Sequence, residues 1–155
     1  MIELLVVIAI IGLLASIVLA SLTSARAKSR DANRLATMEQ LRNALELYAT
    51  ANNGSYPSTG NNWWGACPGF ASHALTGASG YIPNLAPAYI SSLPIDPSGM
   101  CSTGNGYIYN SNGTDYMLLS YGMVETFTQS TNPEKRPSYS GENDFAMYTL
   151  GASTW

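Results

Sequence analysis

The longest uncharged stretch of the chain lies near its start and limits what the rest can fold into. From Leu4 to Leu22, 19 residues contain no charged side chain and no proline. As an α-helix rising ~1.5 Å per residue, this stretch would be ~28 Å long, about the thickness of the hydrocarbon layer of a bilayer. A buried core helix is seldom apolar on every face over such a length, and the apolar part of a signal peptide has only ~7–15 residues. The sequence therefore predicts a membrane-spanning segment.

The residues after this stretch continue the helix with one apolar side. Apolar side chains recur at spacings of three and four, the pattern of an amphipathic helix, at Leu35, Met38, Leu41, Leu45 and Tyr48. The positions between them predict a polar face made of Arg34, Glu39, Gln40, Arg42 and Glu46. Asn52-Asn53-Gly54, with Pro57 beyond, is a typical helix end. We therefore expect one helix over residues 1–52, with a membrane-spanning part (1–22) and an amphipathic part (23–52).

Residues 53–155 are expected to form an extracytoplasmic globular head. Residues 54–106 are rich in Gly, Ser, Asn and Pro and predict mostly loop. Two strand-like runs, 107–111 and 114–119, flank Asn112-Gly113, the preferred pair for a two-residue type I′ turn. Residues 145–150 predict a further strand, and 128–143 a polar loop. The predicted fold class is α+β, with a small antiparallel sheet packed on the apolar side of the long helix.

Charge and composition exclude several classes of function. The net charge is −3, and five of the seven basic residues lie in one segment, at Arg26, Lys28, Arg30, Arg34 and Arg42. From Ala51 onward acidic residues outnumber basic ones, so we expect no general nucleic-acid binding. The chain has one histidine, His73, and no G-x-S-x-G motif, so we expect no enzyme activity, no catalytic residues and no cofactor. Two cysteines are too few for a structural zinc site.

The start of the chain resembles a known family. Residues 2–15, IELLVVIAIIGLLA, look like the mature N-terminal segment of type IV pilins and type II secretion pseudopilins. Residues 53–57 (NGSYP) are similar to the helix end of many pilins. Residues 89–97 (YISSLPIDP), followed by the tyrosine-rich hairpin, are similar to small bacterial pilins and to the major pseudopilin. Residues 58–84 and 122–155 carry no motif of this family.

The resemblance implies a structural subunit that polymerises into a homo-oligomeric helical filament. The expected function is a type IV pilus for adhesion, motility or DNA uptake; the alternatives are a major-type pseudopilin of a type II secretion system or a single-span membrane protein with a ligand-binding outer head. The implied partners are the membrane before assembly, the assembly machinery of the inner membrane and a prepilin peptidase. The implied location is the inner membrane as a single-pass protein, and then an extracellular filament on the cell surface.

The resemblance also assigns a role to Glu3. A carboxylate at membrane depth costs at least a few kcal/mol unless it is protonated or paired. In related filaments this acid pairs with the free, often N-methylated amine of a neighbouring subunit and guides assembly. The apolar helices then form the filament core, which in this chain implies Leu4, Leu5, Val6, Val7, Ile8, Ile10, Ile11, Gly12, Leu13 and Leu14.

Two features depart from the family pattern. Met1 stands at the usual leucine position and no basic leader precedes it, so we expect the natural chain to start further upstream. The basic cluster after the apolar segment would, by the positive-inside rule, place the head in the cytoplasm. We expect the head outside nonetheless, because a basic leader would lie on the cytoplasmic side and the Ser/Asn/Tyr-rich head suits the outside.

Three weaker features complete the sequence predictions. On the secreted side of a membrane two cysteines usually form a disulfide, so we expect a Cys67–Cys101 bond. Asp96 is a weak candidate for a calcium site as in some major pseudopilins, although no second ligand can be named and we expect no other metal site. Trp63 and Trp64 form either a ligand platform or, as we expect, a packing contact.

Overall fold

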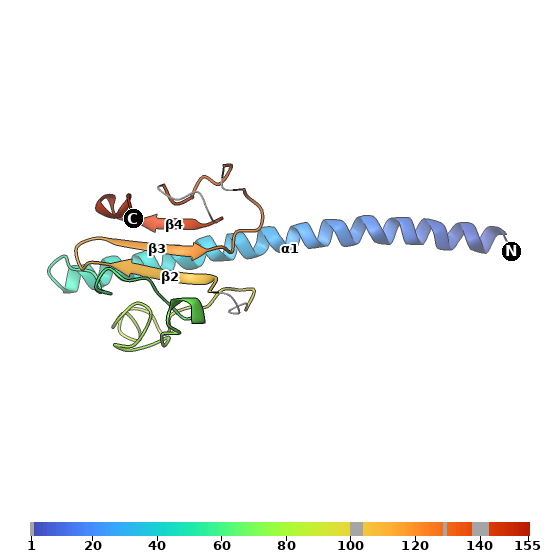
Figure 1. The fold of residues 1–155 in the computed structure, drawn as a ribbon. Coiled ribbons are helices and arrows are strands. Elements are labelled where there is room, and N and C mark those ends of the chain that lie inside the picture. The colour runs from blue at the N-terminus through green and yellow to red at the C-terminus, as the bar shows by residue number, and fades with distance from the viewer. Residues whose placement is uncertain (1, 100–103, 129, 138–142) are drawn as a thin grey trace.

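The structure is a computed structural model that describes residues 2–99, 104–128, 130–137 and 143–155 (Figure 1). It combines one long helix with a four-stranded antiparallel sheet in the order β1-β2-β3-β4. The elements are α1 (Ile2–Ala51), β1 (Trp64–Gly65), β2 (Gly106–Ser111), β3 (Tyr116–Tyr121), β4 (Phe145–Tyr148) and two short 3₁₀ helices, η1 (Pro68–Phe70) and η2 (Leu150–Ala152). The predicted α+β class is confirmed.

Helix α1 is continuous over 50 residues, which corresponds to ~75 Å at ~1.5 Å per residue. Its end is formed by residues that tolerate a left-handed backbone, since Asn53 has φ 55° and Gly54 has φ 80°. The Gly54 N–H turns back and donates to the Ala49 carbonyl at 2.8 Å. The chain then reverses and leads into the head.

The sheet covers the second half of α1, as Figure 1 shows for β2 and β3. Met38, Leu41 and Leu45 are each 0% exposed, and they share one core cluster with side chains of β2, β3 and β4, namely Tyr107, Tyr109, Tyr116, Leu118 and Phe145. Complete burial of one such aliphatic side chain stabilises the fold by about 1.5–3 kcal/mol. The predicted packing of the apolar stripe against the sheet is confirmed.

The opposite face of the sheet carries a smaller core. Because side chains alternate along a strand, Ile108, Met117 and Leu119 point away from α1 and form a second cluster with Ala146 and Ala152. Large side chains from the end of β3 and from the flanking segments pack against this cluster: Tyr121, Trp63, Phe70 and Trp155. The head therefore buries both faces of a thin sheet.

The predicted hairpin forms, but the predicted two-residue turn is wrong. Ser111 pairs directly with Tyr116, so residues 112–115 form a four-residue connection instead of a two-residue type I′ turn. The Asn112 side-chain oxygen accepts hydrogen bonds from the Thr114 and Asp115 N–H groups at 2.9 and 2.8 Å. This side-chain bridge holds Thr114 and Asp115 in the turn, which moves the start of the strand to Tyr116.

The other strand predictions also differ in extent. Strand β4 ends at Tyr148 instead of residue 150, because the chain there turns into η2. Strand β1 lies in a region where the sequence predicts mostly loop, and it is held by pairing with β2, Trp64 opposite Tyr109. Such a two-residue strand has no periodicity of its own to reveal it.

Candidate functional site

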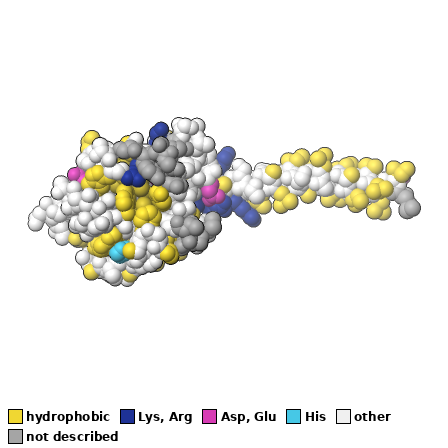
Figure 2. Space-filling model, in the orientation of Figure 1, with side chains coloured by type: hydrophobic (Ala, Val, Ile, Leu, Met, Phe, Trp, Pro, Cys, Tyr) yellow, Lys and Arg dark blue, Asp and Glu magenta, His cyan; other side chains and the backbone are white. Residues whose placement is uncertain are grey.

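The first half of α1 projects from the head as an apolar rod (Figure 2). It is long and apolar enough to cross a membrane, and none of its most apolar 18-residue window is buried within the subunit. Two of its hydroxyls bond within the helix, Ser16 to the Leu13 carbonyl at 2.7 Å and Thr23 to the Ala20 carbonyl at 2.9 Å. The rod therefore presents an apolar, internally hydrogen-bonded surface, which suits either hydrocarbon or other apolar helices.

Glu3 lies in the first turn of α1. It is the only charged residue before Arg26, and among the described residues it forms no ion pair or hydrogen bond with another side chain. A carboxylate near a helix N-terminus interacts favourably with the helix dipole, by roughly 0.3–1 kcal/mol. That is less than the cost of an unpaired charge at membrane depth. A cation able to compensate Glu3 must therefore come from outside this part of the subunit.

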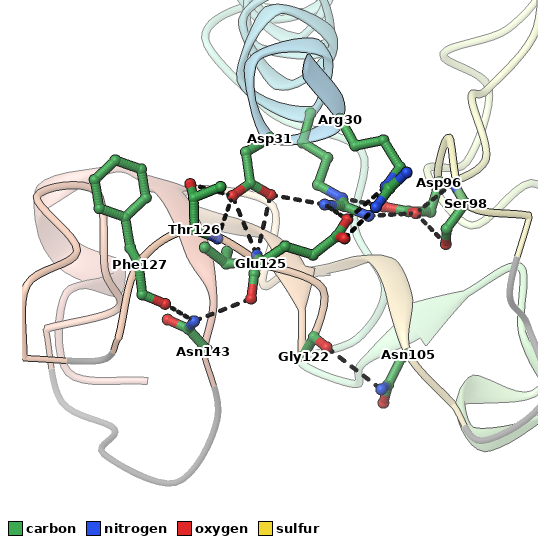
Figure 3. Close-up of polar contacts among 12 residues, drawn as sticks. Arg30, Asp31, Asp96, Ser98, Asn105, Gly122, Glu125, Thr126, Phe127 and Asn143 are labelled. Atoms are coloured by element: carbon green, nitrogen blue, oxygen red, sulfur yellow. Dashed lines mark hydrogen bonds and ion pairs between the residues drawn. The ribbon is translucent and has the colours of Figure 1, made fainter. Parts of the chain in front are cut away.

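A buried ion cluster lies where the rod enters the head (Figure 3). At its centre is Arg34, whose side chain is 1% exposed. The Arg34 guanidinium donates to both carboxylate oxygens of Asp96, Nε to Oδ2 at 2.7 Å and Nη2 to Oδ1 at 3.0 Å. Its Nη1 also donates to Asp31 and to Glu125, both at 2.7 Å. One guanidinium thus joins three carboxylates, which its fork of N–H donors allows.

Asp31 ties the segment after β3 to the helix. Its carboxylate accepts hydrogen bonds from the backbone N–H of Glu125 at 3.1 Å and of Thr126 at 2.8 Å. It also accepts the Thr126 hydroxyl at 2.6 Å, and Arg30 Nε donates to Glu125 at 2.7 Å. We call Arg30, Asp31, Arg34, Asp96 and Glu125 the neck cluster. It fastens two loops of the head to one turn of α1.

Two carboxylates of the neck cluster, Glu125 and Asp96, have lowered pKa values. Hydrogen bonds from Arg30, and then from Arg34, outweigh desolvation and lower the pKa of Glu125 to about 2. Burial alone would raise the pKa of Asp96, but hydrogen bonds from Arg34 and Ser98 lower it below its usual value. Glu125 and Asp96 are therefore ionised at neutral pH, and each pairs with a guanidinium of α1 inside the subunit.

The sequence-based placement of Arg34 on a polar face is wrong. Arg34 is 0% exposed and lies on the same side of α1 as Met38 and Leu41. The buried positions Asp31, Arg34, Met38, Leu41 and Leu45 follow one spacing of three and four. A charged pair that continues the apolar spacing, Asp31 three residues before Arg34, was the signal that could have revealed the cluster.

Most of the basic residues that, by the positive-inside rule, argue against a head outside the cytoplasm have acidic partners in the structure. Arg30 and Arg34 pair with acids of the head and the helix, and Arg42 pairs with Glu39 at 2.7 Å. Within the described residues, Arg26 and Lys28 are the members of this segment that have no acidic partner. The unpaired positive charge beside the apolar rod is therefore two.

Comparison with known proteins places the chain in a family. It is 30% identical to the type II secretion system core protein G of Klebsiella pneumoniae over 156 residues, which cover 97% of this chain and 93% of that protein. The chain belongs to the pilin and pseudopilin family. A long apolar N-terminal helix with a small sheet agrees with this assignment. No protein-family model and no solved structure matches the chain.

The other site residues expected from the sequence of this pilin-family subunit lie on the rod and in the head. The expected filament-core residues from Leu4 to Leu14 lie on the exposed rod, with Leu4 72% and Leu14 57% exposed. Cys67 is buried in the head, but Cys101 lies outside the described residues, so the disulfide stays a prediction. In the part of the chain that the structure describes, no group of three or more His, Cys, Asp or Glu could hold a metal ion.

Asp96, the calcium candidate, has protein partners at both oxygens. Arg34 donates to each of them, and the backbone and hydroxyl of Ser98 donate to Oδ1 at 2.9 and 2.6 Å. The nearest cationic group to this carboxylate in the structure is thus a guanidinium. Calcium usually requires six to eight oxygen ligands, and binding it here would require the Arg34 contact to break.

The two tryptophans lie in different surroundings. Trp64 stacks on the His73 ring, with ring centres 4.0 Å apart and an angle of 12° between the planes. Trp63 packs on the outer core, and the Arg136 guanidinium lies 5.0 Å from the centre of its ring. Both side chains are partly buried, so they do not form one exposed platform.

Proposed function

We propose that this chain is a major-type pseudopilin, a structural subunit that polymerises into the pseudopilus of a type II secretion system. The observation that carries the proposal is the similarity to a type II secretion core protein along nearly the whole length of both chains. The sequence alone favoured a type IV pilus for adhesion, motility or DNA uptake and kept the pseudopilin as an alternative. The full-length similarity favours that alternative.

The division of the subunit into two parts supports polymerisation. The head has a closed core on both faces of its sheet, and the apolar rod contributes nothing to it. The rod can therefore leave the lipid and pack with the rods of other subunits while the head keeps its fold. The neck cluster holds the head on α1 during this transfer, because its ion pairs are internal to the subunit.

In this proposal, Glu3 guides each new subunit into the growing filament. A carboxylate that finds no cation in the described part of its own subunit gains most by pairing with the N-terminal amine of a neighbour in the growing filament. The pairing fixes the axial position of each new subunit. A prepilin peptidase and the assembly machinery of the inner membrane would act before and during this step, and the subunit would wait in the inner membrane as a single-pass protein.

Deletion of the gene in the bacterium that carries it tests the proposal. We expect proteins exported by type II secretion to accumulate inside the cell envelope, and we expect surface pili and twitching motility to be unchanged. A plasmid copy of the wild-type chain should restore export. Loss of pili with normal export would contradict the pseudopilin assignment and support the type IV pilus.

A further inference from the structure

Two basic side chains between the rod and the head have no partner in the described part of the subunit. They are Arg26 and Lys28, and both are exposed. No acidic residue lies between Glu3 and Asp31, and Asp31 is already engaged by Arg34, Thr126 and the Glu125 backbone. The junction therefore carries uncompensated positive charge on the side of the head.

The depth of these residues matches the headgroup layer of a membrane. If the apolar stretch that ends at Leu22 fills the hydrocarbon layer, Arg26 lies ~6 Å and Lys28 ~9 Å beyond it along the helix. The polar layer on each side of a bilayer is ~5–8 Å thick, and long basic side chains reach several ångströms along the helix. Both ammonium and guanidinium groups can thus meet lipid phosphates.

A groove beside Lys28 could hold the lipid whose phosphate contacts the Lys28 ammonium. It has a volume of about 350 Å³ and is lined by Lys28, Asp31, Ala32, Leu35, Thr126 and Phe127. Lys28, Ala32 and Leu35 follow a helical spacing of four and three, so they lie on one side of α1. Phe127 is 38% exposed, and the groove is mostly apolar, with Lys28 as its cation. The Asp31 carboxylate at its edge already accepts hydrogen bonds from Arg34 and Thr126.

We propose that Lys28 and this groove bind the headgroup of an anionic phospholipid from the leaflet beneath the head. The phosphate would accept from the Lys28 ammonium, and the glycerol region would lie against Ala32, Leu35 and Phe127. Arg26, which the helical twist of ~100° per residue places on the opposite side of α1, would contact a second phosphate. The inference rests on the membrane-anchored state in the proposed function, and it assigns the site a role in setting the depth of the subunit before assembly.

Lysine acylation can test this directly because the chain contains only two lysines, Lys28 and Lys135. Lys135 lies in the head, next to Arg136, which contacts Trp155 at the end of the chain. Full-length protein would be placed in nanodiscs of phosphatidylcholine alone or with phosphatidylglycerol, and each lysine's acylation rate measured by mass spectrometry. At ~1 kcal/mol per basic residue at an anionic surface, phosphatidylglycerol should slow Lys28 about fivefold relative to Lys135.

A lysine moved to a neighbouring position distinguishes protection by binding in the groove from protection by the surface potential of the membrane. The double substitution Lys28→Ser with Ser29→Lys keeps a lysine at nearly the same depth but turns it ~100° away from the groove. We expect this lysine to be protected clearly less than Lys28. Equal protection of the two would overturn the groove as a site, as would protection of Lys28 by inorganic phosphate in detergent to the same extent.

Three further outcomes distinguish the sources of failure. Hydrogen exchange over residues 4–22 reports insertion independently, so fast exchange there would overturn the membrane anchor and this inference together. Slow exchange with equal Lys28 acylation in both lipids would overturn the lipid site alone. Lys28 protection that depends on protein concentration instead of lipid charge would show a neighbouring subunit as the occupant and would also overturn the lipid site.

Discussion

Arg34 and Asp96 are 62 residues apart in the chain, yet they form a two-point ion pair at 2.7 and 3.0 Å. Their side chains are 1% and 2% exposed. The pair joins the middle of the long helix to the loop that precedes β2. Among the described residues, the whole neck cluster and the apolar stripe connect the rod to the head, so both transmit force between them.

Replacing Arg34 with Met should destabilise the head strongly. The change leaves the buried carboxylates of Asp31 and Asp96 without their cation, and breaking a buried ion pair in this way typically costs about 3–5 kcal/mol. The matched control is Arg42→Met, which removes an exposed pair with Glu39 and should cost at most ~1 kcal/mol. Urea unfolding of the full chain in detergent, followed by tryptophan fluorescence, measures both. Equal losses would show that the Arg34 pair contributes no more than a surface pair.

The stability of the head should fall in acid because of the neck cluster. The pKa of Glu125 is lowered to about 2 from 4.5 in the folded chain. A carboxylate with a lowered pKa stabilises the fold above its unfolded pKa and loses this contribution as the pH falls through the folded pKa. The free energy of unfolding should therefore decline between pH 4.5 and about 2, and Glu125→Gln should make that decline shallower. Identical pH profiles of the two proteins would rule out this contribution.

Leu41→Ala should cost about 2–5 kcal/mol, because the side chain is 0% exposed at the contact between helix and sheet. Leu47→Ala on the same helix is the control, since Leu47 is 60% exposed, and a surface substitution usually changes stability by within ~0.5 kcal/mol. Denaturant unfolding compares the two variants. A cost for Leu47→Ala as large as that for Leu41→Ala would mean that burial against the sheet does not determine the loss.

Cys67 and Cys101 should be joined in the mature protein. Alkylation under denaturing conditions, followed by mass spectrometry, should find both cysteines unmodified until a reductant is added. The bond should contribute about 2–4 kcal/mol, so reduction should lower the midpoint of unfolding. Alkylation of both thiols without a reductant would contradict the prediction.

The sequence predicted the parts of the fold that have a local periodic signal. The helix and its end at Asn53-Gly54 follow from uninterrupted spacing and from residues that accept a left-handed backbone. The prediction for the turn after Ser111 was wrong. The Asn112 side chain accepts hydrogen bonds from the Thr114 and Asp115 N–H groups and so lengthens the connection. Sequence rules for a two-residue turn do not include that competition.

Only the Asp31–Arg34 pair of the neck cluster has a signal in the sequence, its helical spacing of three. The other acids meet Arg34 only in three dimensions. Asp96 and Glu125 lie in loops without periodicity, 62 and 91 residues from Arg34. A charged residue on a helix is normally assigned to the solvent face, which is why Arg34 was placed there. Only the fold brings together enough acceptors to offset the cost of burying the Arg34 charge.

Filament formation by the Glu3→Ala chain is the measurement that bears most directly on the proposed role. The wild-type and variant subunits would be overproduced with the assembly machinery, and sheared surface material examined by electron microscopy. Glu3 lies far along the rod from the head, so the variant should insert in the membrane and unfold at the wild-type denaturant concentration. We predict filaments from the wild-type chain and none from Glu3→Ala. Wild-type amounts of filament from Glu3→Ala would contradict the assembly role of this carboxylate.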